Sequence, residues 1–157
     1  MLVDLAWRTA YRTAYAGMRV YWRVRRPETH GALVAIWHEG AILLVQPSYL
    51  RYWNLPGGYV KSSETGKQAA LRELAEEVGI RGVDPEALRP AYDDRRPWEG
   101  KRDRVEIFEL DVETRPTIDI DNREIIGARF VPGPEALQMP LFPPITEVIR
   151  NRLAREG

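Results

Sequence analysis

Apolar side chains recur with two different periods along the chain. Between residues 2 and 24, aromatic and aliphatic side chains recur every three or four residues, which is the spacing of one helix face. From residue 31 onward, short apolar runs alternate with turn-forming residues, a pattern typical of strands. The patterning therefore predicts an N-terminal helix followed by a domain built around a sheet.

The order of the later segments predicts the class of fold. The first two apolar runs flank His38-Glu39-Gly40, three turn-prone residues that indicate a hairpin. Strands, a helix, strands and a last helix, in that order, predict an α+β or α/β sandwich with a mixed sheet. The expected strands are 32–37, 41–45, 105–112 and 125–131, and the closing helix is 143–155.

The central helix has clear start and stop signals. Thr65 is followed three residues later by Gln68, which is the pattern of a capping box. Gly79 supplies the stop signal. Apolar side chains between these signals form one face, so the helix is expected to pack that face on the sheet.

The opposite face of this helix carries three carboxylates within about one turn. Glu73, Glu76 and Glu77 stand at positions i, i+3 and i+4, where like charges repel one another. Such a face is either simply solvated or organised around a hard divalent cation, since Mg²⁺ prefers carboxylate oxygens and bridges substrate phosphates.

The surrounding spacing favours the second interpretation. The segment reads Gly58-x5-Glu64-x7-Arg72-Glu73-Leu74-x-Glu76-Glu77-x-Gly79-Ile80. This spacing resembles the signature box of the Nudix hydrolases, and every specified position of that box is filled. The resemblance implies a Nudix-type α/β/α sandwich with a mixed β-sheet, to which this chain adds an N-terminal helix. It divides the chain into a helix and connector at 1–30 and a Nudix domain at 31–157.

The resemblance also implies a metal site. Glu73, Glu76 and Glu77, helped by the backbone carbonyl of Gly58, would bind Mg²⁺ or Mn²⁺. A glycine at position 58 agrees with this role, because a side chain there would obstruct a carbonyl that approaches an ion.

The remaining polar residues of the box have implied roles around that site. Arg72 and Glu64 would pair across the loop and hold it against the helix, and a guanidinium fork suits such a pairing. The general base is left open among Glu64, Glu76, Glu77 and a later loop residue, Glu124. Glu124 is equally well interpreted as a surface loop residue.

The reaction implied is attack of water on a phosphoanhydride, a reaction that needs charge neutralisation and no covalent nucleophile. The substrate would be a nucleoside diphosphate linked to another moiety, such as a nucleotide sugar, ADP-ribose or a nucleoside triphosphate. In the family, a proline at about the position of Pro97 accompanies ADP-ribose substrates. A non-catalytic nucleotide-sensing domain on the same fold is the alternative. The two histidines, His30 and His38, are interpreted as structural.

Several aromatic residues are candidates for holding a nucleobase, because aromatic rings stack on bases. They are expected in loops, together with a polar loop at 93–102 whose basic residues would meet substrate phosphates or only solvent. The aromatic candidates are Tyr49, Tyr52, Trp53, Tyr92 and Trp98.

Composition narrows the class of protein further. A chain of 157 residues suits one domain, and the absence of cysteine excludes disulfide scaffolds, thiolate metal sites and cysteine nucleophiles. Equal numbers of cationic and anionic residues, 23 of each, argue against a globally basic nucleic-acid binder. No uncharged apolar run approaches ~18 residues, so no transmembrane segment is expected and the cytoplasm is the expected location.

The N-terminal helix is locally basic. Six arginines against two acidic residues give residues 1–30 a net charge of +4, which leaves −4 for the remainder. Its aromatic face is expected to pack on the domain or on a second subunit, which makes a homodimer plausible. A helix that lies on a membrane surface is the alternative.

Overall fold

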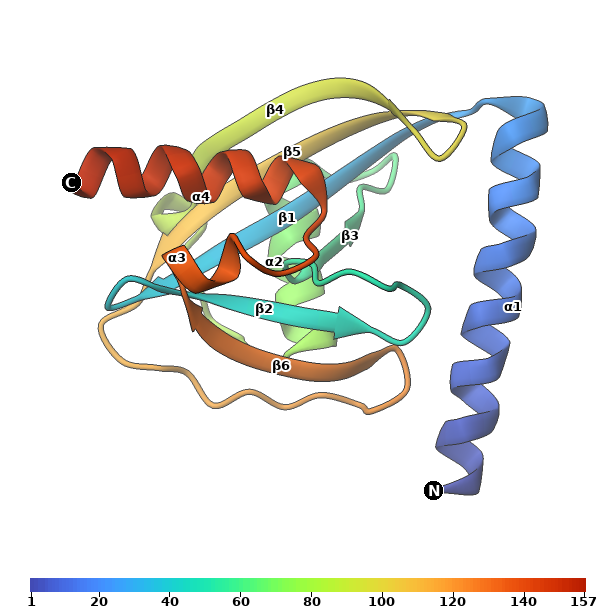
Figure 1. Ribbon diagram of the computed structural model, residues 1–157, viewed down its shortest axis with the longest axis horizontal. Coiled ribbons are helices and arrows are strands. Elements are labelled where there is room, and N and C mark those ends of the chain that lie inside the picture. The colour runs from blue at the N-terminus through green and yellow to red at the C-terminus, as the bar shows by residue number, and fades with distance from the viewer.

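The computed structural model describes all 157 residues as a sheet between helices, with one long helix set beside it (Figure 1). The α-helices are α1 (Leu2–Arg25), α2 (Gly66–Glu77), α3 (Gly133–Ala136) and α4 (Pro143–Glu156), with one 3-10 turn, η1 (Pro85–Ala87). The strands are β1 (Glu28–His38), β2 (Ala41–Pro47), β3 (Gly57–Tyr59), β4 (Arg89–Trp98), β5 (Lys101–Asp111) and β6 (Ile125–Pro132).

The six strands form one mixed sheet, as the sequence predicted. Their order is β4-β5-β1-β2-β6, and the short β3 pairs with the first half of β1. β1 and β5 run parallel, whereas the other pairs are antiparallel. β1 begins at Glu28, four residues before the predicted strand, and its hairpin with β2 turns on two residues, Glu39 and Gly40, both with positive φ.

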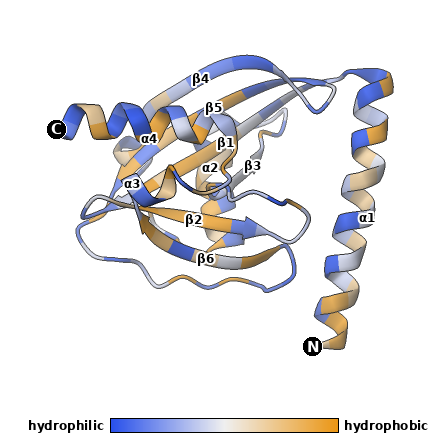
Figure 2. Ribbon diagram, viewed as in Figure 1, coloured by the Kyte–Doolittle hydropathy of each residue, from blue (hydrophilic) through white to orange (hydrophobic).

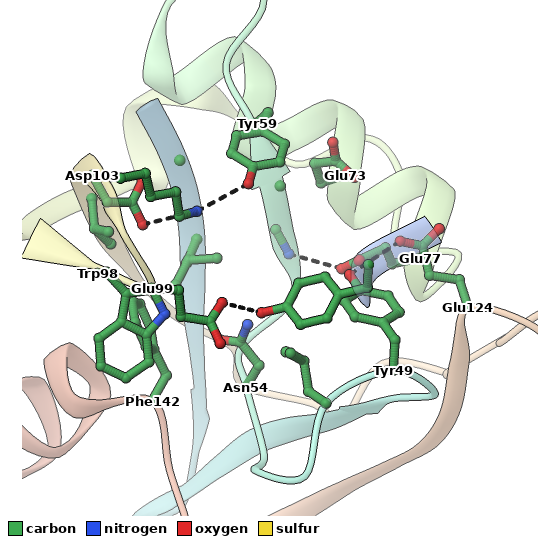
Figure 3. Close-up of a pocket in the computed structure, with 18 of the residues that line it drawn as sticks. Tyr49, Asn54, Tyr59, Glu73, Glu77, Trp98, Glu99, Asp103, Glu124 and Phe142 are labelled. Atoms are coloured by element: carbon green, nitrogen blue, oxygen red, sulfur yellow. Dashed lines mark hydrogen bonds and ion pairs between the residues drawn. The ribbon is translucent and has the colours of Figure 1, made fainter. Parts of the chain in front are cut away.

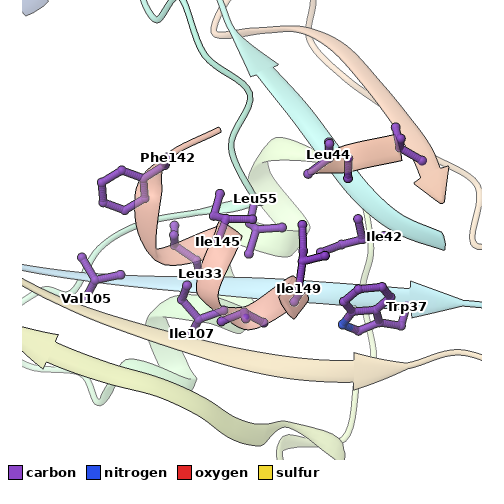
Figure 4. Close-up of a cluster of buried hydrophobic side chains, with 14 residues drawn as sticks. Leu33, Trp37, Ile42, Leu44, Leu55, Val105, Ile107, Phe142, Ile145 and Ile149 are labelled. Atoms are coloured by element: carbon purple, nitrogen blue, oxygen red, sulfur yellow. The ribbon is translucent and has the colours of Figure 1, made fainter. Parts of the chain in front are cut away.

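Two hydrophobic cores lie on the two faces of the sheet, so the layers are helix, sheet and helix. Alternate residues of β1 serve the two cores, because successive side chains of a strand point to opposite faces. Val34 and Ile36 pack with Leu74 of α2, whereas Leu33 and Trp37 pack on the other side. Figure 4 shows the second core, which α4 covers, and Figure 2 shows the apolar strands between helices that are polar outside.

The polar segment 93–102 is a β-hairpin, so the prediction of a loop was wrong. β4 is the edge strand of the sheet and pairs with β5 from Arg89 to Trp98, so Tyr92 and Trp98 lie in a strand and not in a loop. Residues 93–97 of this edge strand are exposed on both faces, so no apolar alternation reveals them, and an edge strand tolerates prolines such as Pro97. Cross-strand ion pairs support it, for example a bidentate pair of Arg104 with Asp93 at 2.8 and 2.7 Å.

α1 packs part of its aromatic face on the loops at one side of the sandwich (Figure 1), whereas Trp7, Met18 and Tyr21 of that face are exposed, so the predicted packing on the domain holds for only part of the face. Tyr11 and Tyr15 contact the ring of Tyr49, and Trp22 is buried. Arg12 donates to the carbonyl of Ser48 at 2.9 Å. None of the helices has the length and hydropathy that a membrane-spanning segment requires.

Candidate functional site

A cavity of about 350 Å³ lies between the sheet, α2 and α1, within the range of small-molecule sites. Figure 3 shows its two ends: Glu73, Glu77 and Glu124 gather at one, and Trp98 and Phe142 stand at the other. Charged side chains on its lining are Lys61, Arg72, Lys101, Glu73, Glu77, Glu99, Asp103 and Glu124. Five of these are anionic and three are cationic, so an anionic ligand enters favourably only together with cations.

The capping box holds the start of α2 in place, as predicted. The Thr65 hydroxyl accepts from the Gln68 backbone N–H at 3.3 Å, and the Gln68 side chain accepts from the Thr65 N–H at 2.8 Å. Two otherwise unpaired backbone donors are thereby satisfied. The helix ends before Gly79, whose φ of 73° suits glycine.

Arg72 ties the loop before α2 to the helix, which confirms its predicted pairing with Glu64. Its Nε and one terminal nitrogen donate to the two Glu64 oxygens at 3.2 and 2.7 Å, and it also donates to the Tyr59 carbonyl at 3.0 Å. The guanidinium hydrogen bonds lower the pKa of Glu64 to about 2. Glu64 is therefore a fixed anion at neutral pH and a poor proton acceptor.

Arg72 also donates to two carboxylates of the predicted metal set, at 2.5 Å to Glu73 and 3.3 Å to Glu76. Glu73 lines the cavity, whereas the Glu76 side chain is 59% exposed and lies outside the lining. Burial raises the pKa of Glu73, although Arg72 opposes this effect. No group of three or more His, Asp or Glu side chains stands ready in a metal-binding arrangement.

Glu77 sits at the acidic end of the cavity. It accepts a hydrogen bond from the Gly57 N–H at 2.8 Å, which joins the end of α2 to β3. Burial, followed by the charges of Glu73 and Glu124, raises its pKa well above the usual range. A crowd of partly buried carboxylates is costly unless protons or cations compensate its charge.

The two adjacent glycines let β3 approach this crowd. A Cβ at Gly58 would lie 2.5 Å from a Glu73 oxygen, and a Cβ at Gly57 would lie 2.7 Å from the Leu33 Cα. The missing side chain at Gly58 therefore leaves a cradle that the Glu73 carboxylate occupies. The oxygens of this carboxylate and of Glu77 are ligands that a small divalent cation prefers.

Glu124 lines the same cavity, so of its two interpretations the structure supports the one that faces the site. Asp121 accepts hydrogen bonds from the backbone N–H groups of Arg123 and Glu124 at 2.9 and 3.1 Å, and this turn sets the direction of the loop. The Tyr49 hydroxyl donates to Glu124 at 3.4 Å. Burial and then the charge of Glu73 raise the pKa of Glu124.

Sequence reasoning missed the polar pair that β5 adds to the cavity wall. Lys101 and Asp103 are buried and 3.4 Å apart, and the Lys101 ammonium lies 4.3 Å from the centre of the Trp22 ring. The alternation of Lys101, Asp103 and Val105 places all three on one face of a strand, but the signal requires the strand to start at Lys101. Of the aromatic candidates, Tyr49, Tyr52 and Trp98 line the cavity and Trp53 and Tyr92 do not.

Neither histidine lines the cavity. His30 pairs with Glu106 at 2.5 Å, and His38 Nδ1 lies 3.1 Å from the Val112 carbonyl oxygen. Both contacts join β1 to β5 or to the residue that follows β5, in agreement with the structural interpretation of the two histidines.

Residues 27–151 match the NUDIX domain family. A stretch of 52 residues is 44% identical to a protein of Bacillus subtilis (strain 168) named "Putative 8-oxo-dGTP diphosphatase", and it covers 32% of this chain and 35% of that relative. The chain spans between 12% and 35% of the length of the curated relatives that it matches.

Solved structures share the fold. A MutT protein from Methanosarcina mazei Go1 has a TM-score of 0.69 at 24% identity, over 83% of this chain and 96% of that one. A bifunctional NMN adenylyltransferase/ADP ribose pyrophosphatase from Francisella tularensis, complexed with AMP and an Mn ion, has a TM-score of 0.70 at 18% identity. The match covers 94% of this chain and 48% of the Francisella tularensis chain.

Proposed function

Because this chain belongs to the NUDIX domain family, we propose that it is a pyrophosphohydrolase that cleaves nucleoside diphosphates linked to another moiety. Nucleotide sugars, ADP-ribose and nucleoside triphosphates have this linkage, and the expected location is the cytoplasm. One observation carries the proposal: Glu73, Glu77 and Glu124 converge at one end of a cavity whose other end is aromatic. A phosphate chain suits the first end and a nucleobase the second.

Mg²⁺ or Mn²⁺ is the proposed cofactor. Glu73, Glu77 and the Gly58 carbonyl would hold it at the acidic end, with Glu76 turned in from the rim. The excess of anions on the lining and the cradle at Gly58 support this assignment. When bound, such an ion neutralises phosphate charge and lowers the pKa of water.

The chain's own residues orient the reacting groups. Arg72 fixes the loop of Tyr59 and Glu64 against α2 and so sets the direction of Glu73. Glu124 is the proposed general base, because it lines the cavity outside the proposed set of metal ligands and burial raises its pKa. A carboxylate with a raised pKa accepts a proton from water more readily near neutral pH.

Substitution of Glu77 tests this proposal. We expect the wild-type chain, with Mg²⁺ or Mn²⁺, to hydrolyse at least one member of a set of nucleoside triphosphates, nucleotide sugars, dinucleotides and ADP-ribose. Glu77→Gln keeps the shape of the side chain and removes its charge, so turnover should fall by about 10²-fold or more. Glu39→Gln is the matched control, since Glu39 is 83% exposed in a distant turn. Full activity of Glu77→Gln would refute the assignment.

We also infer a homodimer through the outer face of α1. Nine of the ten exposed large hydrophobic side chains lie in the first 24 residues, among them Val3, Val20, Tyr21 and Val24. The helix is about 36 Å long, and its outer positions carry no charge: 3, 6, 10, 13, 17, 20, 21 and 24. A second copy can cover such a face by symmetric pairing. Light scattering should give twice the chain mass, and Val20→Glu should give a monomer.

A further inference from the structure

Glu99 is a cavity carboxylate that the proposed hydrolysis does not use. It stands in the two-residue turn between β4 and β5, with a φ of 48°, and its side chain is 16% exposed. Figure 3 shows its carboxylate between the aromatic pair Trp98 and Phe142 and the acidic group near Glu77. An anion in that position needs a separate explanation.

The turn itself does not direct the Glu99 side chain inward. Glu39 occupies the same position of the β1–β2 turn, also with a φ of 48° and a following glycine, yet its side chain is 83% exposed. Residues of the same type in the same backbone conformation thus have opposite surroundings. Contacts outside the turn must hold Glu99 in the cavity.

Those contacts come from α1. The Tyr15 hydroxyl donates to one Glu99 oxygen, and the Arg19 Nε lies 3.4 Å from the other. α1 approaches the turn closely, since a Cβ at Gly100 would lie 3.0 Å from the Arg23 Cα. α1 precedes the residues that match the family, so this arrangement is an addition to the common domain.

Glu99 retains capacity to accept hydrogen bonds from a ligand. Each carboxylate oxygen can accept two hydrogen bonds; the Tyr15 hydroxyl uses one on one oxygen, and Arg19 forms an ion pair with the other oxygen. Asn54 lines the same cavity, and its side-chain oxygen accepts from the Leu55 N–H at 2.9 Å. This bond leaves the Asn54 amide nitrogen as the group offered to a ligand. The cavity therefore combines a fixed acceptor with a donor.

This combination matches one kind of base. A carboxylate pairs bidentately with two adjacent N–H donors. Guanine offers two such donors, on N1 and N2, beside an O6 acceptor, whereas the corresponding edge of adenine offers one donor beside an acceptor. Building on the proposed function, we propose that Glu99 selects guanine nucleotides over adenine nucleotides and that Tyr15 of α1 positions its carboxylate.

Steady-state kinetics with matched nucleotide pairs tests the selection. GTP and ATP form one pair, GDP-glucose and ADP-glucose the other, each measured with Mg²⁺. Wild type should have the lower KM for the guanine member. Glu99→Gln keeps the size of the side chain but turns one acceptor into a donor, so the guanine KM should rise about tenfold while the adenine KM and kcat stay within about twofold. Glu39→Gln, from the equivalent turn, should change none of these values.

A matched pair of variants, Tyr15→Phe and Tyr21→Phe, tests the role of Tyr15. Tyr15→Phe keeps the ring that contacts Tyr49 and Trp22 and removes only the hydroxyl that holds Glu99. It should lower the guanine-to-adenine ratio of kcat/KM about threefold or more, whereas Tyr21→Phe, on the exposed face, should leave the ratio unchanged. A variant that only loosened the fold would weaken the binding of guanine and adenine nucleotides equally, so the guanine-to-adenine ratio of kcat/KM would stay constant.

Calorimetric binding of GDP and ADP separates this inference from the proposed hydrolysis. Tighter binding of GDP that Glu99→Gln abolishes would support the inference even if no nucleotide were hydrolysed. Hydrolysis with equal KM for both bases, or an unchanged ratio in Glu99→Gln, would overturn the inference and leave the proposed function standing. These titrations contain Mg²⁺, and absence of binding to both GDP and ADP would overturn the inference, whereas the proposed function is refuted only if no member of the substrate set above is hydrolysed.

Discussion

Adding one methyl group at Gly58 should remove activity while leaving the fold intact. The added Cβ would lie 2.5 Å from a Glu73 oxygen, about 1 Å closer than ordinary van der Waals contact. The obstacle is the end of a flexible side chain, so the chain can fold by moving the carboxylate. A displacement of about 1 Å at a reacting site costs up to about 10²-fold in rate. We therefore expect kcat/KM of Gly58→Ala to fall about 10²-fold.

The assay combines steady-state kinetics with thermal unfolding, and neighbouring glycines supply the contrast. Gly57→Ala places its Cβ 2.7 Å from the backbone of Leu33 at a φ of 150°, so it should fail to fold stably. Gly17→Ala, in α1 with no atom near its Cβ, should leave both activity and unfolding temperature unchanged or slightly raise the latter. If Gly58→Ala retains wild-type activity, or loses activity only because it unfolds, the cradle does not set the direction of Glu73.

Three further results follow from the same geometry. The pKa of Glu64 falls from 4.5 to about 2 on folding because Arg72 binds it, so its stabilisation is complete above pH 4.5 and disappears as the pH falls toward 2. In urea unfolding, Glu64→Gln should therefore have a lower free energy of unfolding than wild type at neutral pH, and this difference should shrink as the pH falls from 4.5 toward 2. A difference that stays constant over this pH range would contradict the pairing. Thr65→Ala removes the α2 cap and should cost about 1 kcal/mol, or about 2–4 °C in calorimetric Tm; Thr13→Ala, on exposed α1, should cost less. Mg²⁺ at 100 times its Kd should stabilise wild type by about 2.7 kcal/mol and Glu77→Gln by much less, and an equal shift would exclude Glu77 as a ligand.

The sequence was sufficient where local signals and tertiary demands agree. The capping box at Thr65 and the apolar runs of β1, β2, β5 and β6 predicted those elements because each pattern follows the period of its own structure. The pairing of Glu64 with Arg72 was accessible because both residues belong to one short motif. Each of these features depends on residues that are close in sequence.

Features that depend on distant residues could not be predicted. β4 carries polar side chains on both faces, and only its pairing with β5 makes it a strand. Tyr15 and Trp22 belong to the N-terminal aromatic helix face, yet nothing in that face shows that it closes a cavity whose charged residues lie between Lys61 and Glu124. Periodicity reports which face of a helix is buried, but it does not report the partner.

The negative charge of the cavity comes partly from residues of one short motif and partly from distant residues that only the fold brings together. The motif accounts for Glu73 and Glu77, but the hairpin and the later loop add Glu99, Asp103 and Glu124, so the anionic excess arises only in the folded chain. Such an excess opposes the entry of a polyphosphate unless cations come with it, because like charges in a partly buried site repel strongly. Nucleotide affinity should therefore rise with the concentration of Mg²⁺ and fall in its absence, beyond any effect on turnover. The same excess makes Glu99 useful at the base end, where a neutral base with N–H donors meets an acceptor and the phosphates remain at the other end.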